Sequence, residues 1–338
     1  MRRNHGNSLI SIMVGLALVS LLLYGVFQLY ASINTNAAQV RKTNLLSINS
    51  GTALLKMTKE IRLAGSFGCF NSHIITKKVA LGMIESIPNN ITGAGRFESA
   101  FNGIKVFSSS AIPAADSGAL NLTNDNLVNA SEILKIQYAS RQAFISSFAI
   151  NGDSLAVINL ESPSYALAAS NNLTKSAINK YSLDFNNSSN ALYLLSSCSR
   201  IDQIQGGLVG TTLTINGALQ KIPLSAHDSS SWQLMNMETR YYYLATYNGI
   251  KSLYSKFLKS DGSISKSELV IRGVNKINYS FEVESAASYQ NKTLINMLGS
   301  DWNNIKQLTI QLELQAIETE SSPSPLIESL SQTIAIGN

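Results

Sequence analysis

Charged residues are scarce in this chain, and so are the residue types that build most catalytic and metal sites. Aspartate, glutamate, lysine and arginine make up 14% of the 338 residues, with only two cysteines and three histidines. The histidines are scattered along the sequence, so a zinc site, which needs about four nitrogen or sulfur ligands together, is not indicated. No glycine-rich loop ends in the Lys-Ser/Thr of a phosphate-binding site. These absences argue against an enzyme and predict no cofactor and no metal.

Charge of one sign does not dominate either. The formal net charge is +5 at pH 7, and no basic block is long enough to indicate nucleic-acid binding. The length is enough for one large domain or two small ones. The remaining polar residues are largely serine and asparagine, which favour loops and turns between structured elements.

A long hydrophobic run is present at the N-terminus. Residues 9–31 contain no aspartate, glutamate, lysine or arginine. The run is as long as the roughly 20 helical residues that span the hydrocarbon core of a bilayer. Arg2 and Arg3 precede it, so we expect the N-terminus to stay in the cytoplasm while the chain crosses a membrane once.

Three interpretations of this start compete. A secretory signal peptide has a shorter apolar region and a small-residue cleavage site, which are not found here. An uncleaved signal anchor fits the hydropathy. The third interpretation rests on detail, because Gly6, Asn7 and the following Ser8-Leu9-Ile10 resemble the processing site of type IV pilins. That resemblance implies that a prepilin peptidase removes residues 1–6 after Gly6 and methylates the new N-terminus at Asn7.

The sequence departs from the pilin pattern at two positions. Pilins usually begin the mature chain with phenylalanine or methionine, whereas this chain has Asn7. They usually carry glutamate at the fifth mature position, and here that residue is Ser11. In the family this glutamate is thought to neutralise the N-terminal ammonium of the next subunit, a pairing that the high cost of an unpaired charge in hydrocarbon explains. Serine cannot provide that charge.

The helix is expected to continue beyond the apolar run, from Ser8 to Ala64. Gly65 is a natural stop, and Lys56 and Glu60, four residues apart, predict an ion pair along the helix. Residues at three- and four-residue spacing form an apolar stripe, which predicts that this half packs on a globular part: Leu46, Ser50, Ala53, Leu54, Met57, Ile61 and Ala64.

The two cysteines, Cys69 and Cys198, lie far apart in the sequence. If the globular part is outside the cytoplasm, a disulfide between them is expected, and its long loop would correspond to roughly 4–5 kcal/mol in the chain-entropy model. The alternative is two buried free thiols.

Strand patterns dominate the rest of the chain, and the fold class predicted is α+β. Runs expected to be strands cover residues 103–107, 131–138, 154–160, 191–200, 268–281, 305–314 and 331–338. Two hairpins are expected around the turns Asn216-Gly217 and Asn248-Gly249, because Asn-Gly suits a type I′ turn. The tyrosines before the second turn, Tyr241 to Tyr243, fit half-buried sheet residues better than a stacking platform for sugars or bases.

Several of these stretches resemble PilW-type minor pilins of type IV pili. The resemblance covers the leader junction, the long helix, Ile61 to Cys69, Cys198 to Asp202, the tyrosine-rich hairpin and the C-terminal strands. It implies a pilin-like fold, in which a long N-terminal helix packs on an antiparallel β-sheet head with a large β-rich insertion. The implied domains are the leader (residues 1–6), the transmembrane half of the helix (7–31), its periplasmic half (32–65) and the head (66–338).

The function implied is that of a processed minor pilin that helps to prime type IV pilus assembly and stays at the pilus tip. Its implied partners are prepilin peptidase, other minor pilins, the major pilin, the assembly platform, the lipid bilayer and a tip adhesin. The pilus could serve twitching motility, cell adhesion or DNA uptake. A minor pseudopilin of a type II secretion system and an unprocessed membrane-anchored periplasmic binding or adhesion module remain as alternatives.

Overall fold

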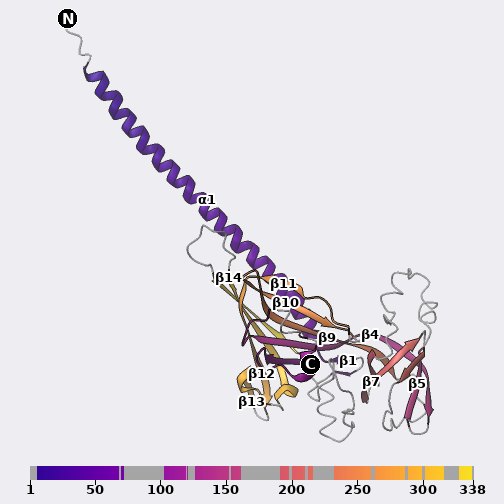
Figure 1. Cartoon of the computed structure of the whole chain (residues 1–338). Helices are drawn as coiled ribbons and strands as arrows, with labels where there is room; N and C mark the ends of the chain where they lie inside the picture. Colours follow the sequence, from indigo (N-terminus) through magenta and orange to yellow (C-terminus); the bar gives the residue numbers. More distant parts are fainter. Residues whose placement is uncertain are drawn as a thin grey trace, which may run out of the picture. The chain divides into compact units, whose positions relative to one another are not determined.

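The computed structural model describes residues 6–67, 70–71, 103–118, 120, 126–151, 154–160, 191–197, 200–209, 212–215, 232–259, 263–285, 288–298, 301–315 and 327–336. In these residues the chain is α+β, with one long N-terminal helix followed by antiparallel strands (Figure 1). It divides into two compact units, residues 1–52 and residues 53–338. The predicted fold class is therefore confirmed.

The long helix α1 runs from Gly6 to Leu63. This agrees within two residues with the helix expected from the sequence. Gly65 follows just after the end of the helix, and its φ of 71° lies in the left-handed region that favours glycine at a helix end. In the second unit the predicted apolar stripe is confirmed, because Ala53, Met57 and Ile61 are all buried.

An open antiparallel sheet forms the centre of the second unit. Its order is β11-β10-β9-β4-β3. The bounds of these strands are β3 Ile104–Ser108, β4 Glu132–Asn151, β9 Gln233–Tyr247, β10 Ile250–Leu258 and β11 Glu268–Arg272. Strands β4 and β9 are much longer than their neighbours, so both extend beyond this sheet.

The extensions of β4 and β9 belong to a small six-stranded barrel. Its other strands are β5 Ser154–Leu160, β6 Ala191–Ser197, β7 Arg200–Val209 and β8 Thr212–Ile215. The pairings run β4-β5-β8-β7-β6-β9, and β9 pairs with β4 again, which closes the ring. The interior is filled by apolar side chains, including Ile158, Tyr193, Leu208 and Leu234, as in other small barrels.

A four-stranded antiparallel sheet completes the second unit. Its order is β13-β12-β14-β15, with bounds β12 Val274–Ser285, β13 Ser288–Thr293, β14 Ile305–Gln315 and β15 Ile327–Ala335. Strand β14 buries alternate residues, from Leu308 to Leu314, as its sequence pattern predicts. One apolar core joins this sheet, the open sheet and the last turns of α1. The run expected as a strand over residues 268–281 is divided into β11 and β12 at Gly273, where φ is 75°.

Short elements connect these parts. They are β1 Ser66–Phe67, β2 Phe70–Asn71, α3 Ala114–Ser117, η2 Leu294–Asn296 and η3 Asp301–Asn304.

The tyrosine-rich hairpin forms as expected, but its tyrosines lie deeper than expected. Ile250 pairs with Tyr247 around a turn in which Asn248 and Gly249 both have positive φ, as a type I′ turn requires. Tyr241, Tyr242 and Tyr243 are fully buried instead of half-buried. The reason is that both faces of the open sheet are covered, so neighbouring residues on β9 enter different apolar clusters.

Several sequence predictions lie outside the described residues. These are the leader residues 1–5, both cysteines of the expected disulfide, Cys69 and Cys198, and the turn Asn216-Gly217 of the first hairpin.

Candidate functional site

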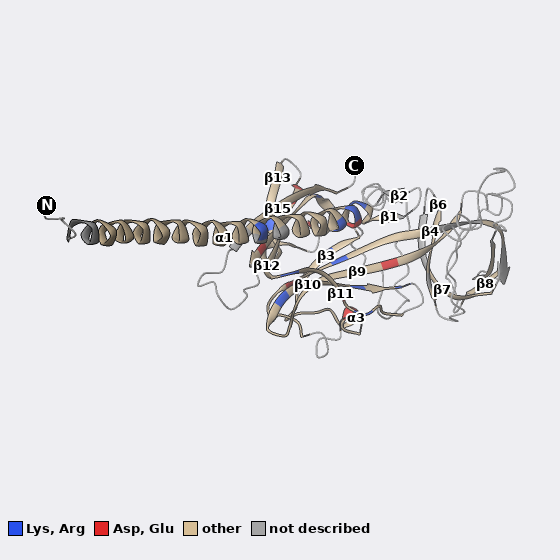
Figure 2. Ribbon diagram, turned by 90° about the horizontal axis from the view of Figure 1, so that it is seen from above, with Lys and Arg blue, Asp and Glu red and all other residues tan. Residues whose placement is uncertain are grey.

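The first unit consists of the apolar part of α1. Residues 11–41 form a helix long and apolar enough to cross a membrane. At 1.5 Å per residue, 31 residues extend about 46 Å, more than the roughly 30 Å of a hydrocarbon core. Large apolar side chains are exposed on all sides of it, from Ile12 to Ile33. In Figure 2 this part of the helix is uniformly tan, because no Lys, Arg, Asp or Glu occurs between Arg3 and Arg41.

Two polar side chains of this span donate hydrogen bonds inside the helix. Ser20 donates a hydrogen bond to the carbonyl oxygen of Ala17, and Gln28 Nε2 donates to the hydroxyl of Tyr24. Such bonds lower the cost of placing polar groups in hydrocarbon, where water cannot satisfy them. At Ser20 and Gln28 the span is therefore compatible with a bilayer.

The residues predicted for processing lie at the start of α1. Gly6 is the first helical residue, Asn7 follows in the first turn, and Ser11 is exposed one turn later. The expected cleavage junction therefore involves the first two described residues of α1. Ser11 adds no charge to the span.

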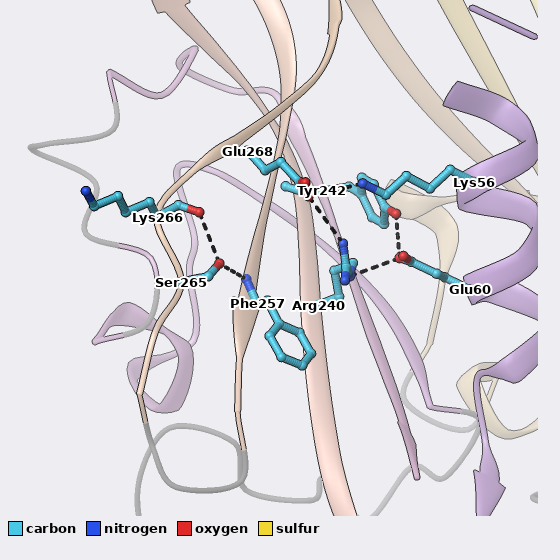
Figure 3. Close-up of polar contacts among 9 residues, drawn as sticks. Lys56, Glu60, Arg240, Tyr242, Phe257, Ser265, Lys266 and Glu268 are labelled. Atoms are coloured by element: carbon cyan, nitrogen blue, oxygen red, sulfur yellow. Dashed lines mark hydrogen bonds and ion pairs between the residues drawn. The ribbon is translucent and has the colours of Figure 1, made fainter. Parts of the chain in front are cut away.

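The end of α1 carries a polar cluster in the second unit (Figure 3). Glu60, on the last turns of the helix, accepts a short hydrogen bond from the hydroxyl of Tyr242 on β9. The Nε atom of Arg240, two residues earlier on β9, lies 3.1 Å from Glu60 Oε2. Because these groups are largely out of water, the cluster favours one rotation of the helix against the sheet.

A second carboxylate extends this cluster to the surface. Lys56 Nζ lies 3.1 Å from Glu268 Oε2 on β11, and Arg240 reaches the same oxygen at 3.7 Å. Lys56 therefore makes its direct ion pair with Glu268 rather than with Glu60, while its charge still lowers the pKa of Glu60. Glu60 lies on the buried side of the helix, next to Met57 and Ile61, and so reaches β9 rather than Lys56.

The ionisation of the cluster follows from burial and neighbouring charge. Burial raises the pKa of Glu60 above its ordinary value of 4.5, although the hydrogen bond from Tyr242 and the charge of Arg240 oppose this. Burial also raises the pKa of Tyr242, so its hydroxyl stays protonated. The hydrogen bond from Lys56 lowers the pKa of the exposed Glu268. Burial lowers the pKa of Arg240, but its anionic neighbours, Glu60 first, outweigh that effect and raise it.

A pH dependence of stability follows from Glu60. Because its pKa is higher in the folded than in the unfolded protein, acidification from neutrality toward 4.5 stabilises the folded state through this group. We expect wild type to gain free energy of unfolding relative to Glu60→Gln over this interval, measured by urea unfolding at each pH. The contributions of Glu132 and Asp301 remain in both proteins and cancel in the difference. Parallel pH profiles for the two proteins would contradict the expectation.

The contacts of the cluster join the last turns of α1 to β9 and β11, as a structural anchor would. No group of three or more His, Cys, Asp or Glu side chains in the described part of the chain could hold a metal ion. No family model, curated protein or solved structure matches the chain significantly.

Sequence reasoning missed this anchor, although one signal pointed to it. Glu60 is spaced three residues from Met57 and four from Ala64, on the same helical stripe that the sequence predicts to be buried. A carboxylate on a buried stripe indicates a partner elsewhere in the fold, because an unpaired buried charge is costly. The partners on β9 could not be identified, since about 180 residues separate them from the helix.

Proposed function

We propose that this protein is a minor pilin similar to the PilW type, which primes assembly of a type IV pilus and stays at its tip. The observation that carries the proposal is the first part of α1, which is apolar and free of charged residues up to Arg41 and follows the leader with Arg2 and Arg3 in the sequence. This combination matches what a prepilin peptidase substrate needs: a cytoplasmic leader, a junction glycine and a continuous membrane helix.

The α+β layout supports the same proposal. The N-terminal helix is apolar in its first part, and the apolar stripe of its last turns packs on antiparallel sheet. This arrangement resembles a pilin subunit in outline. The first part would hold the subunit in the inner membrane before assembly. The second unit would face the periplasm.

Ser11 is the basis for the tip position. A subunit within the shaft needs an acidic side chain at the fifth mature position to neutralise the ammonium of its neighbour. A charge left unpaired in hydrocarbon costs roughly 2.5–3.5 kcal/mol on insertion scales. A subunit at the tip has no neighbour ahead of it and loses nothing by carrying serine there.

Replacing Ser11 with glutamate tests this position. We expect Ser11→Glu to raise the ratio of this protein to the major pilin in sheared pili severalfold, because the new carboxylate would let it enter the shaft. Quantitative immunoblotting and immunogold labelling along single fibres would measure this. Ser11→Gln is the matched control, because glutamine is similar in size to glutamate but uncharged. It should leave the ratio unchanged. Wild-type protein distributed along the shaft would contradict the tip position.

Two other functions would fit the same helix. A minor pseudopilin would have the same N-terminus. This function would be favoured if deleting the gene stopped protein secretion but not pilus formation. An anchored periplasmic binding module would keep residues 1–6.

A further inference from the structure

A lysine and an aspartate are buried together on the face of the open sheet that points away from α1. The Nζ atom of Lys135, on β4, lies 2.8 Å from Oδ1 of Asp116, on α3, and their side chains are 3% and 0% exposed. The hydroxyl of Tyr241, on β9, donates a hydrogen bond of 2.7 Å to the same Oδ1. An amine, a carboxyl group and a phenol thus meet where water is excluded.

The fold holds these three groups in place. Lys135 and Tyr241 are paired neighbours on β4 and β9, so their side chains stand side by side on one face. The connection between β3 and β4, which carries Asp116, is fastened across this face. Val128 N donates to Leu244 O, and Ser109 N donates to Ser131 O.

Apolar side chains pack around the pair, and two further lysines flank it in cross-strand register, Lys105 beside Lys135 and Lys256 beside Tyr241. The buried side chains that form this cluster with Tyr241 are Phe107, Leu120, Ile133, Tyr243, Ala245 and Leu258. In such surroundings neutral groups are favoured over charged ones. The second carboxylate oxygen of Asp116, Oδ2, is buried and has no hydrogen-bond partner among the described residues. As a carboxylate, Asp116 therefore keeps one buried oxygen without a hydrogen bond from these residues, which makes a plain ion pair a costly arrangement.

We propose that Lys135 and Asp116 condense into an intramolecular isopeptide bond. The reaction joins –NH₃⁺ and –COO⁻ into –CO–NH– and releases one water. Nζ forms a bond to Cγ, the bond from Cγ to Oδ2 breaks, and Oδ2 leaves as water with two protons that come from the ammonium. No oxidant, reductant or other reactant takes part.

Each neighbour has a role in this step. In the reacting pair one proton passes from Lys135 to Asp116, which makes the amine nucleophilic and the carboxyl group electrophilic. The hydroxyl of Tyr241 hydrogen-bonds to Oδ1 and stabilises the negative charge that develops there in the tetrahedral intermediate. The contact between Nζ and the carboxyl group supplies the proximity that such a condensation needs. The unpaired Oδ2 is the atom that is lost.

The bond would close a covalent ring from Asp116 to Lys135 and fasten the β3–β4 connection to the open sheet. Local opening of this connection would then no longer separate it from β4, so the ring resists proteolysis and force. This property does not depend on the function proposed above.

Mass spectrometry of the full-length, membrane-extracted protein tests the bond. No Lys or Arg lies between Lys105 and Lys135, and the next one is Arg141. Trypsin does not cut after a modified lysine, so we expect a single peptide of residues 106–141, lighter by one water than its sequence. Cleavage after Glu132 should then leave residues 106–132 and 133–141 joined. Ordinary peptides 106–135 and 136–141 would overturn the proposal.

Variants assign the partners. Lys135→Arg keeps a cation beside Asp116 but cannot condense, so the joined peptide should be lost completely. Lys256→Arg changes another lysine next to Tyr241, on β10, and should leave the joined peptide unchanged. A wild-type peptide linking Asp116 to Lys256 instead would overturn the assignment to Lys135. Tyr241→Phe should slow formation of the bond on the order of a hundredfold after refolding, and an unchanged rate would overturn the role of Tyr241.

Discussion

Replacing Glu60 with alanine is expected to lower the free energy of unfolding of the second unit by about 2–4 kcal/mol. The change leaves the hydroxyl of Tyr242, which is fully buried, without its acceptor. It also leaves Arg240 with only the carboxylate of Glu268, at 3.7 Å. Urea unfolding of the detergent-extracted protein, followed by tyrosine and tryptophan fluorescence, measures this loss.

Two control variants separate the anchor from the helix itself. Glu60→Gln keeps an acceptor for Tyr242 and replaces a carboxyl group whose pKa is raised by burial. The free energy of unfolding should therefore fall by no more than about 1 kcal/mol. Lys59→Ala changes an exposed neighbour on the same turn and should be close to neutral. Equal losses for Glu60→Ala and Lys59→Ala would show that the contact with β9 does not stabilise the protein.

Gly103→Ala is expected to destabilise the second unit by about 3–4 kcal/mol. Gly103 has a φ of 64°, and a Cβ there would lie 2.2 Å from Gly65 N and 2.3 Å from Gln137 O. These are backbone atoms of a tight junction, in which Gly65 N donates to Gln137 O and Gln137 N donates to Gly103 O. Since backbone cannot rotate away as a flexible side chain can, the end of α1, β3 and β4 must all shift. Thermal unfolding would show the loss as a lowered melting temperature.

Gly118→Ala is the matched control for this prediction. Gly118 has a φ of −70°, and a Cβ there would meet no atom within 4 Å. An alanine at this position should therefore leave stability nearly unchanged. If the two glycine variants melted at the same temperature, the close approach of Gly103 to Gly65 would not exist in solution.

Local patterns account for what the sequence predicted well. The helix from Gly6 to Leu63, the turn at Asn248-Gly249 and the alternation in β14 each depend on residues close together in the chain. Capping, turn chemistry and periodicity act over a few residues, so they can be interpreted without the fold.

Features that depend on distant pairing were not predictable in the same way. The barrel closes because β4 and β9 are long enough to pair with each other and also with β5 and β6, respectively. No local sequence pattern predicts these pairings. Strand β15 is longer than expected and begins at Ile327, because its partner β14 extends its register that far. Asp116 meets Lys135 only because the β3–β4 connection folds back over the sheet. The burial of Tyr241 to Tyr243 likewise depends on layers covering both faces.

The measurement that tests the account most directly is the N-terminal mass of the membrane-extracted protein, made with and without the prepilin peptidase. We predict a mature chain that begins with N-methylated Asn7. This form should be lost without the peptidase and in the Gly6→Ala variant, whose helix and membrane span are otherwise preserved. An N-terminus at Met1 or Arg2 under both conditions would contradict the account and favour an anchored periplasmic module that is never processed.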